Sequence, residues 1–124
     1  MNLVQVVDQL LQREAGSVAA CQHLPARPAI TADFPAELDP LIVAALRQRG
    51  IESLYSHQAT AIEQVLAGRH VVVVTPTASG KTMCYNLPVL NRILAEPEAR
   101  ALYLFPTKAL AQDQVAELQS LVDL

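Results

Sequence analysis

A short run of small residues that ends in Gly80, Lys81 and Thr82 is the part of the chain best suited to chemistry. Glycine lets the backbone approach a ligand closely, a lysine ammonium pairs with phosphate oxygens, and a threonine hydroxyl can bind Mg²⁺. Four consecutive valines, Val71 to Val74, precede the run, and a helical pattern follows it. A strand, a tight loop and a helix N-terminus form a site for nucleotide phosphates. The loop therefore predicts binding of the β- and γ-phosphates of a triphosphate together with Mg²⁺.

The loop departs from the strict pattern GxxxxGK[ST] at one position, because Thr75 stands where the first glycine is expected. The flanking strand and helix compensate for this difference, and no acidic residue occurs between Glu63 and Glu96. The alternative is a Ser-Gly turn with a solvated lysine. We favour the nucleotide site, with Lys81 against the β- and γ-phosphates and the Thr82 hydroxyl on Mg²⁺. These two residues are the predicted catalytic pair.

Gln58 lies about two dozen residues before the loop, within the sequence Leu-Tyr-Ser-His-Gln. A glutamine amide offers a donor and an acceptor, so it can pair with adenine N7 and N6-H₂ together. The alternative is an ordinary polar residue in the first turn of a helix. Tyr55 is a candidate for stacking on adenine, and a core position is an equally good interpretation. The residues predicted to bind ATP are Gln58, Thr75, Thr77, Ala78, Ser79, Gly80, Lys81 and Thr82.

A third segment, Phe105 to Gln114, joins a second apolar strand to the last helix. Pro106, Thr107 and Lys108 stand at that junction. A helix N-terminus with a hydroxyl and a lysine is suited to a phosphodiester, so these three residues are the predicted nucleic-acid contact. The alternative is Thr107 as a simple helix cap.

Together the three segments resemble motifs 0, I and Ia in the first RecA-like domain of superfamily 2 helicases, over roughly residues 50–115. They are most similar to the MrfA/YprA-type DNA-repair helicases. That resemblance implies an ATP-dependent helicase that uses ATP and Mg²⁺, moves 3′→5′ on DNA, contacts single-stranded DNA, and has a second RecA-like domain and a cysteine-rich domain further along. Leu41 occupies the position where DEAD-box proteins have an aromatic residue, which makes RNA a less favoured substrate.

The elements expected to position these residues alternate between strand and helix. The predicted fold is α/β, a RecA-like P-loop NTPase whose parallel sheet is incomplete and preceded by N-terminal helices. Residues 1–38 are interpreted as an N-terminal extension of one helix and a proline-rich connector, and 39–124 as the first part of the ATP-binding domain. We expect helices over 2–15, 39–49, 56–67, 80–95 and 108–122, with Ser56 as the cap of the third, and strands over 70–75 and 101–105.

The sequence has 124 residues and a formal charge of −3, which argues against a grip on nucleic acid by the whole surface. It has no apolar stretch long enough to span a membrane. Cys21 and Cys84 are far apart in sequence, which favours a reducing cytoplasmic setting. No apolar strand ends in Asp-Glu, so we expect the chain alone not to hydrolyse ATP. The alternatives are a P-loop ATPase or kinase acting on a small molecule, and an inactive truncated product.

Overall fold

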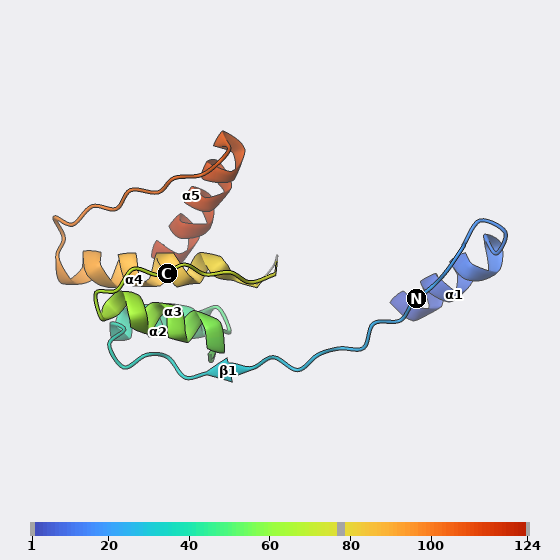
Figure 1. The fold of residues 1–124 in the computed structure, drawn as a ribbon, viewed down its shortest axis with the longest axis horizontal. Coiled ribbons are helices and arrows are strands. Elements are labelled where there is room, and N and C mark those ends of the chain that lie inside the picture. Colours follow the sequence, from blue (N-terminus) through green and yellow to red (C-terminus); the bar gives the residue numbers. More distant parts are fainter. Residues whose placement is uncertain (1, 77–78, 124) are drawn as a thin grey trace.

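The computed structural model describes residues 2–76 and 79–123. Its body is a group of helices, α2, α3 and α4, with α5 alongside (Figure 1). A separate helix, α1, is joined to this body by an extended connector (Figure 1). The site predicted from the sequence lies where the chain enters α4.

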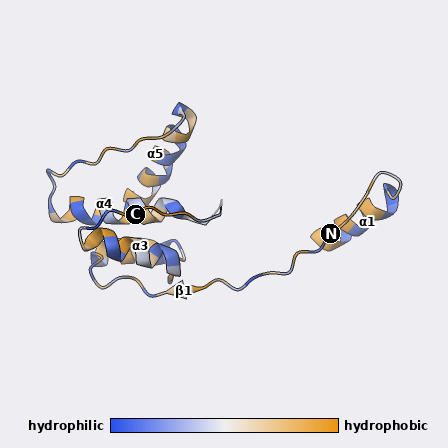
Figure 2. Ribbon diagram, viewed as in Figure 1, coloured by the Kyte–Doolittle hydropathy of each residue, from blue (hydrophilic) through white to orange (hydrophobic). Residues whose placement is uncertain are grey.

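Helix α1, Leu3–Arg13, confirms the predicted N-terminal helix. Asn2 and Gln5 cap it reciprocally, because each side chain accepts a hydrogen bond of 3.0 Å from the other's backbone N–H. None of its residues is buried, and hydrophobic and hydrophilic residues alternate along it (Figure 2). Leu3, Val4 and Leu10 are more than half exposed. The cap explains where the helix begins, while packing contributes nothing to it within the described residues.

The connector reaches the body through a two-residue strand. β1, Thr31–Ala32, pairs antiparallel with β2, Leu54–Tyr55, with Thr31 opposite Tyr55. Helix α3, Ser56–Leu66, begins directly after β2. The short sheet therefore fixes the chain immediately before the residues expected to face the nucleotide.

Helices α2, Pro40–Gln48, α4, Lys81–Ala95, and α5, Lys108–Val122, occupy the predicted positions. Asp39 caps α2 by accepting a 2.8 Å hydrogen bond from the Leu41 N–H. Asn91 of α4 accepts a 2.7 Å hydrogen bond from the Asp39 N–H, which joins the start of α2 to α4. Helix α3 also packs against α4. The core between these elements consists of Leu38, Ile42, Leu46, Leu54, Ala59, Ile62, Leu87 and Leu121.

The two predicted parallel strands, 70–75 and 101–105, are extended, but within residues 2–76 and 79–123 neither has a hydrogen-bonded strand neighbour. Alternate side chains on both segments are almost fully exposed: Val72 is 89% exposed, Val74 88%, Leu102 86% and Leu104 83%. Unlike a helix, a strand obtains its backbone hydrogen bonds from neighbouring strands. Both segments run in the same direction, opposite to α4 (Figure 1). Among the described residues the observed sheet is therefore the antiparallel β1–β2 pair, and the predicted parallel sheet is not confirmed.

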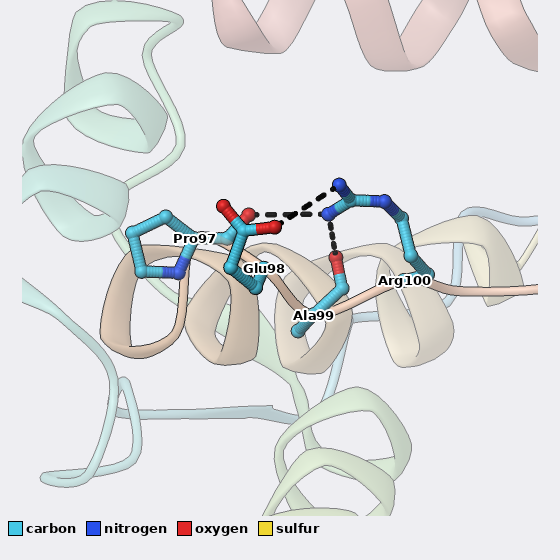
Figure 3. Close-up of polar contacts among 4 residues, drawn as sticks. All are labelled: Pro97, Glu98, Ala99 and Arg100. Atoms are coloured by element: carbon cyan, nitrogen blue, oxygen red, sulfur yellow. Dashed lines mark hydrogen bonds and ion pairs between the residues drawn. The ribbon is translucent and has the colours of Figure 1, made fainter.

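A tight turn connects α4 to the second extended segment (Figure 3). The Arg100 guanidinium donates hydrogen bonds to the carbonyl oxygens of Ala99 (2.9 Å) and Pro97 (3.2 Å), and lies 3.6 Å from the Glu98 carboxylate. The side chains of Arg100 and Glu98 are exposed, so the ion pair adds little stability. None of the helices in the described ranges has both the length and the apolar character that a membrane crossing requires.

Candidate nucleotide site

Gly80 sets the backbone conformation at the entrance to α4. It has φ +71°, in the left-handed region that favours glycine, and it caps the helix N-terminus. A Cβ atom placed on Gly80 would lie 2.5 Å from Nε2 of Gln58. The dihedral angle therefore favours glycine at this position, and a larger residue would also have to displace the Gln58 amide.

The side chain of Lys81 folds back over the loop that precedes it. Its Nζ donates hydrogen bonds to the carbonyl oxygens of Thr75 (2.8 Å) and Pro76 (2.9 Å), and lies 3.3 Å from the Thr75 hydroxyl. That hydroxyl also bonds the Ser79 hydroxyl at 2.5 Å. The ammonium is thus directed into the loop, and Thr75, Ser79 and Lys81 form one network. Thr82, in the first turn of α4, is half-buried beside it.

Gln58 joins the start of α3 to the loop. Its Oε1 accepts a 2.9 Å hydrogen bond from the Tyr55 N–H, and its Nε2 donates a 2.8 Å bond to the carbonyl oxygen of Gly80. The residue is only 4% exposed. Because Gln58 reaches back to Tyr55, the cap position of α3 is Tyr55, and the expected cap Ser56 is the first helical residue.

His57 makes a second contact with the loop, which the sequence analysis did not single out. Its Nε2 lies 2.9 Å from the carbonyl oxygen of Ser79, and its ring stacks on Tyr55 with centroids 5.8 Å apart. The only sequence signal for this role is its position next to Gln58. The structure thus brings Tyr55, Gln58, Thr75 and the Ser79–Thr82 run together, whereas the predicted contacts Thr77 and Ala78 lie outside the described residues.

The predicted nucleic-acid segment forms a separate junction. The Thr107 hydroxyl accepts a 3.2 Å hydrogen bond from the Leu110 N–H, so Thr107 does cap α5. Pro106 and Lys108 are exposed. The loop before α4 and the junction before α5 both lie at the end of the body where the extended segments finish (Figure 1).

A cavity of about 970 Å³ is lined by residues of the two extended segments, α3, α4 and α5, and Lys81 and Thr82 are among them. Val71, Val73 and Phe105 contribute an apolar lining. Burial raises the pKa of the Cys84 thiol, although a backbone hydrogen bond and the charge of Lys81 act in the opposite direction. Burial, reinforced by nearby Tyr85, likewise raises the pKa of Tyr103. The Tyr103 hydroxyl is buried and has no hydrogen-bond partner among the described residues.

Comparisons with known proteins relate this chain to helicases. The family model for the DEAD/DEAH box helicase matches residues 55–124. The chain is 48% identical over 122 residues to the ATP-dependent helicase YprA of Bacillus subtilis and 38% identical over 115 residues to the ATP-dependent helicase HRQ1 of Saccharomyces cerevisiae. These alignments cover 98% and 91% of this chain, and 16% and 10% of the relatives' lengths.

A crystal structure of the DUF1998 helicase MrfA, bound to DNA and AMPPNP, superposes on 99% of this chain with a TM-score of 0.81 and 48% sequence identity. The superposition covers 17% of the MrfA chain, so this chain matches a small part of a much longer protein. The RecA-like helicase fold expected from the sequence is supported by this match. On the family model and the identities together, the chain belongs to the DEAD/DEAH box helicase family.

Proposed function

We propose that this chain is the ATP-binding front part of a longer ATP-dependent helicase that acts on nucleic acid, DNA in particular. The loop of Gly80, Lys81 and Thr82, held against Gln58, is the observation that carries the proposal. The names of the relatives support it, as does the DNA and AMPPNP in the MrfA structure. The similarity also favours a 3′→5′ DNA-repair enzyme of the MrfA/YprA type.

ATP fits the donor set of the loop. The first amides of a helix have no partners within that helix, and an ammonium beside them adds positive charge, so the entrance to α4 suits a polyphosphate. We assign Thr75, Thr77, Ala78 and the Ser79–Thr82 run to the phosphates. Gln58 keeps one N–H and one lone pair beyond its two bonds in this structure, and we assign these to adenine, with Tyr55, which is 44% exposed, as a stacking neighbour.

Mg²⁺ fits the Thr82 hydroxyl, because this ion is held by few protein ligands, several waters and the phosphates themselves. The described residues contain no cluster of three metal-binding side chains, so a carboxylate from further along the chain would complete the site. A bound Mg²⁺ would supply positive charge beside the phosphates, and Lys81 would add to that effect.

We assign Pro106, Thr107 and Lys108 to the backbone of single-stranded DNA. Thr107 already caps α5 through its hydroxyl, so its N–H and the exposed Lys108 ammonium are the groups left for a phosphate. A second RecA-like domain would close over ATP on the other side. The separated cysteines favour the cytoplasm as the setting.

The extended segments 70–75 and 101–105 are proposed to become strands of a parallel sheet in the complete polypeptide. Their common direction, the α4 crossover between them and the exposed alternate side chains support this assignment. The apolar cavity between them is suited to further strands. We retain the division into an extension over 1–38 and a domain fragment over 39–124, noting that β1 and Leu38 of the extension contact the domain fragment.

The test is ATP turnover by the complete polypeptide with Lys81→Ala. We expect turnover to fall by at least about a thousandfold, because removing a catalytic electrostatic contact commonly costs 10²–10³-fold and this lysine meets two phosphates. Arg100→Ala is the matched control, since that guanidinium lies in the exposed turn after α4. Turnover that survives in the Lys81 variant would refute the assignment.

A separate measurement distinguishes a helicase from a small-molecule ATPase. Binding of a labelled single strand without sequence preference, weakening as salt rises, is expected of the helicase. A plot of the logarithm of affinity against the logarithm of salt concentration has a slope set by the number of phosphate contacts. Lys108→Ala should reduce the magnitude of that slope by about 1, the value for one contact. If the complete polypeptide does not bind DNA, a small-molecule substrate becomes the better interpretation.

A further inference from the structure

Two neighbouring side chains at the start of α3 bind two neighbouring carbonyl groups in the loop. His57 Nε2 lies 2.9 Å from the Ser79 oxygen, and Gln58 Nε2 donates to the Gly80 oxygen at 2.8 Å. A carbonyl oxygen can only accept, so the His57 Nε2 carries a proton in this contact. Both contacts span 22 residues of sequence, and both residues come from the element that the short β1–β2 sheet anchors.

Because peptides are planar and trans, these contacts also determine which way the N–H groups of the loop point. In such a peptide the C=O of one residue and the N–H of the next point in opposite directions. Holding the Ser79 carbonyl toward His57 therefore turns the Gly80 N–H away from α3. The Gly80 carbonyl accepts from Gln58 at 2.8 Å and from the Met83 N–H at 3.2 Å, and its direction turns the Lys81 N–H away in the same manner. Successive N–H groups directed to one side form a concave site for an anion.

The surroundings hold His57 in this orientation. Its ring is partly buried and stacks on Tyr55 with an interplanar angle of 13°. Gly80 has φ +71°, and this left-handed conformation allows the two carbonyls to meet two adjacent side chains. The orientation of His57 is thus set by its stacking on Tyr55, by its contact with the loop and by its place in the first turn of α3.

We propose that His57 is a positioning residue for the phosphate loop, which together with Gln58 fixes the peptides whose N–H groups bind the β-phosphate. This inference rests on the proposed function, because it assigns a phosphate to the loop. His57 itself does not touch the nucleotide. Its effect should therefore appear with any ligand that carries the polyphosphate and be missing with the nucleoside alone.

The experiment compares three variants in the complete polypeptide. His57→Phe keeps an aromatic ring for Tyr55 and removes the donor. His57→Gln removes the ring and keeps a donor at a similar reach. His23→Phe is the matched control, because His23 is exposed in the connector. Inorganic tripolyphosphate, ADP and adenosine are titrated into each variant by calorimetry, and each melting temperature is recorded.

We expect His57→Phe to raise the Kd of tripolyphosphate and ADP by roughly fivefold to tenfold, the factor that corresponds to one ordinary hydrogen bond. Adenosine binding should change by less than about twofold, and His57→Gln should recover most of the phosphate affinity. Wild-type affinity for tripolyphosphate in His57→Phe would overturn the proposal. An equal loss for adenosine and tripolyphosphate would also overturn it, since that pattern belongs to general unfolding of the site. If wild-type protein binds neither tripolyphosphate nor ADP, the nucleotide function itself fails.

Discussion

The helical core and the two extended segments use similar apolar residues with different results. Leu46, Ile62 and Leu87 are fully buried between α2, α3 and α4, whereas Val72 and Leu104 are almost fully exposed. A helix satisfies its own backbone hydrogen bonds and needs only one packed face. A strand needs neighbours at its edges as well as cover on its faces. The difference shows that the apolar residues of the helices find cover within the described residues, whereas alternate apolar residues of the two extended segments do not.

The largest expected effect is in the core. Ile62→Ala removes a fully buried side chain and should lower the free energy of unfolding by about 2–5 kcal/mol. Val72→Ala removes an exposed one and should change it by less than about 0.5 kcal/mol in this chain. Urea unfolding followed by circular dichroism measures both. Equal costs for the two variants would show that segment 70–75 is covered in solution.

An intermediate effect is expected at the junction of the two regions. Gly68 and Gly80 both have positive φ, but a Cβ on Gly68 meets nothing within 4 Å, while one on Gly80 meets Gln58. Gly68→Ala should cost about 1 kcal/mol from backbone strain alone, and Gly80→Ala about 2 kcal/mol because Gln58 must also move. Thermal unfolding of both variants tests the comparison. If the two costs are the same, the Gln58 contact does not constrain the loop.

The smallest effect should come from a tyrosine pair beside the extended segment 101–105. Tyr85 donates a 2.6 Å hydrogen bond to Gln114, whereas the buried Tyr103 hydroxyl has no partner in the described parts of the chain. Tyr85→Phe should cost about 1 kcal/mol, and Tyr103→Phe should be neutral or slightly stabilising, because its hydroxyl has no bond to lose and its burial is unfavourable. Chemical denaturation of the two variants at pH 7 measures the difference.

The same pair predicts a dependence on pH. Burial raises the pKa of Tyr103 above its usual value of 10.0, so the folded state holds this proton more tightly than the unfolded state does. The associated stability is present below pH 10 and is lost as the pH rises through the folded-state pKa. Above pH 10 the free energy of unfolding should therefore fall less steeply with pH in Tyr103→Phe than in the parent chain. Identical profiles would show that the hydroxyl is solvated.

The helices could be predicted because their signals are local. Asp39-Pro40 marks the start of α2 and Thr107 the start of α5, and both caps are made in the structure. The β1–β2 pair was missed because strands of two residues are too short to show a periodicity, and β1 also lies in a proline-containing stretch. The apolar residues of 70–75 and 101–105 predicted that both segments are extended. Those residues do not indicate which other segment would pair with each one, so the pairing could not be predicted.

For the candidate site, the sequence pointed to residues that the structure brings together, but several contacts among them were missed. Gly80, Lys81 and Gln58 follow from motif spacing, and the structure brings them together. The contact of His57 with Ser79 depends on how α3 meets the loop, which no local pattern encodes. The same holds for the start of α3, where a side chain three residues into the helix replaces the expected serine cap.

The inward fold of Lys81 has a consequence for how tightly any nucleotide can be held. Its ammonium already bonds two carbonyl oxygens and lies near a hydroxyl. A polyphosphate that binds this lysine must replace those bonds with its own. The measured affinity therefore reflects the difference in free energy between lysine bonded to the loop and lysine bonded to the phosphates. Shortening the side chain would then weaken the resting loop and the loaded loop alike, and binding constants alone would understate what the lysine does.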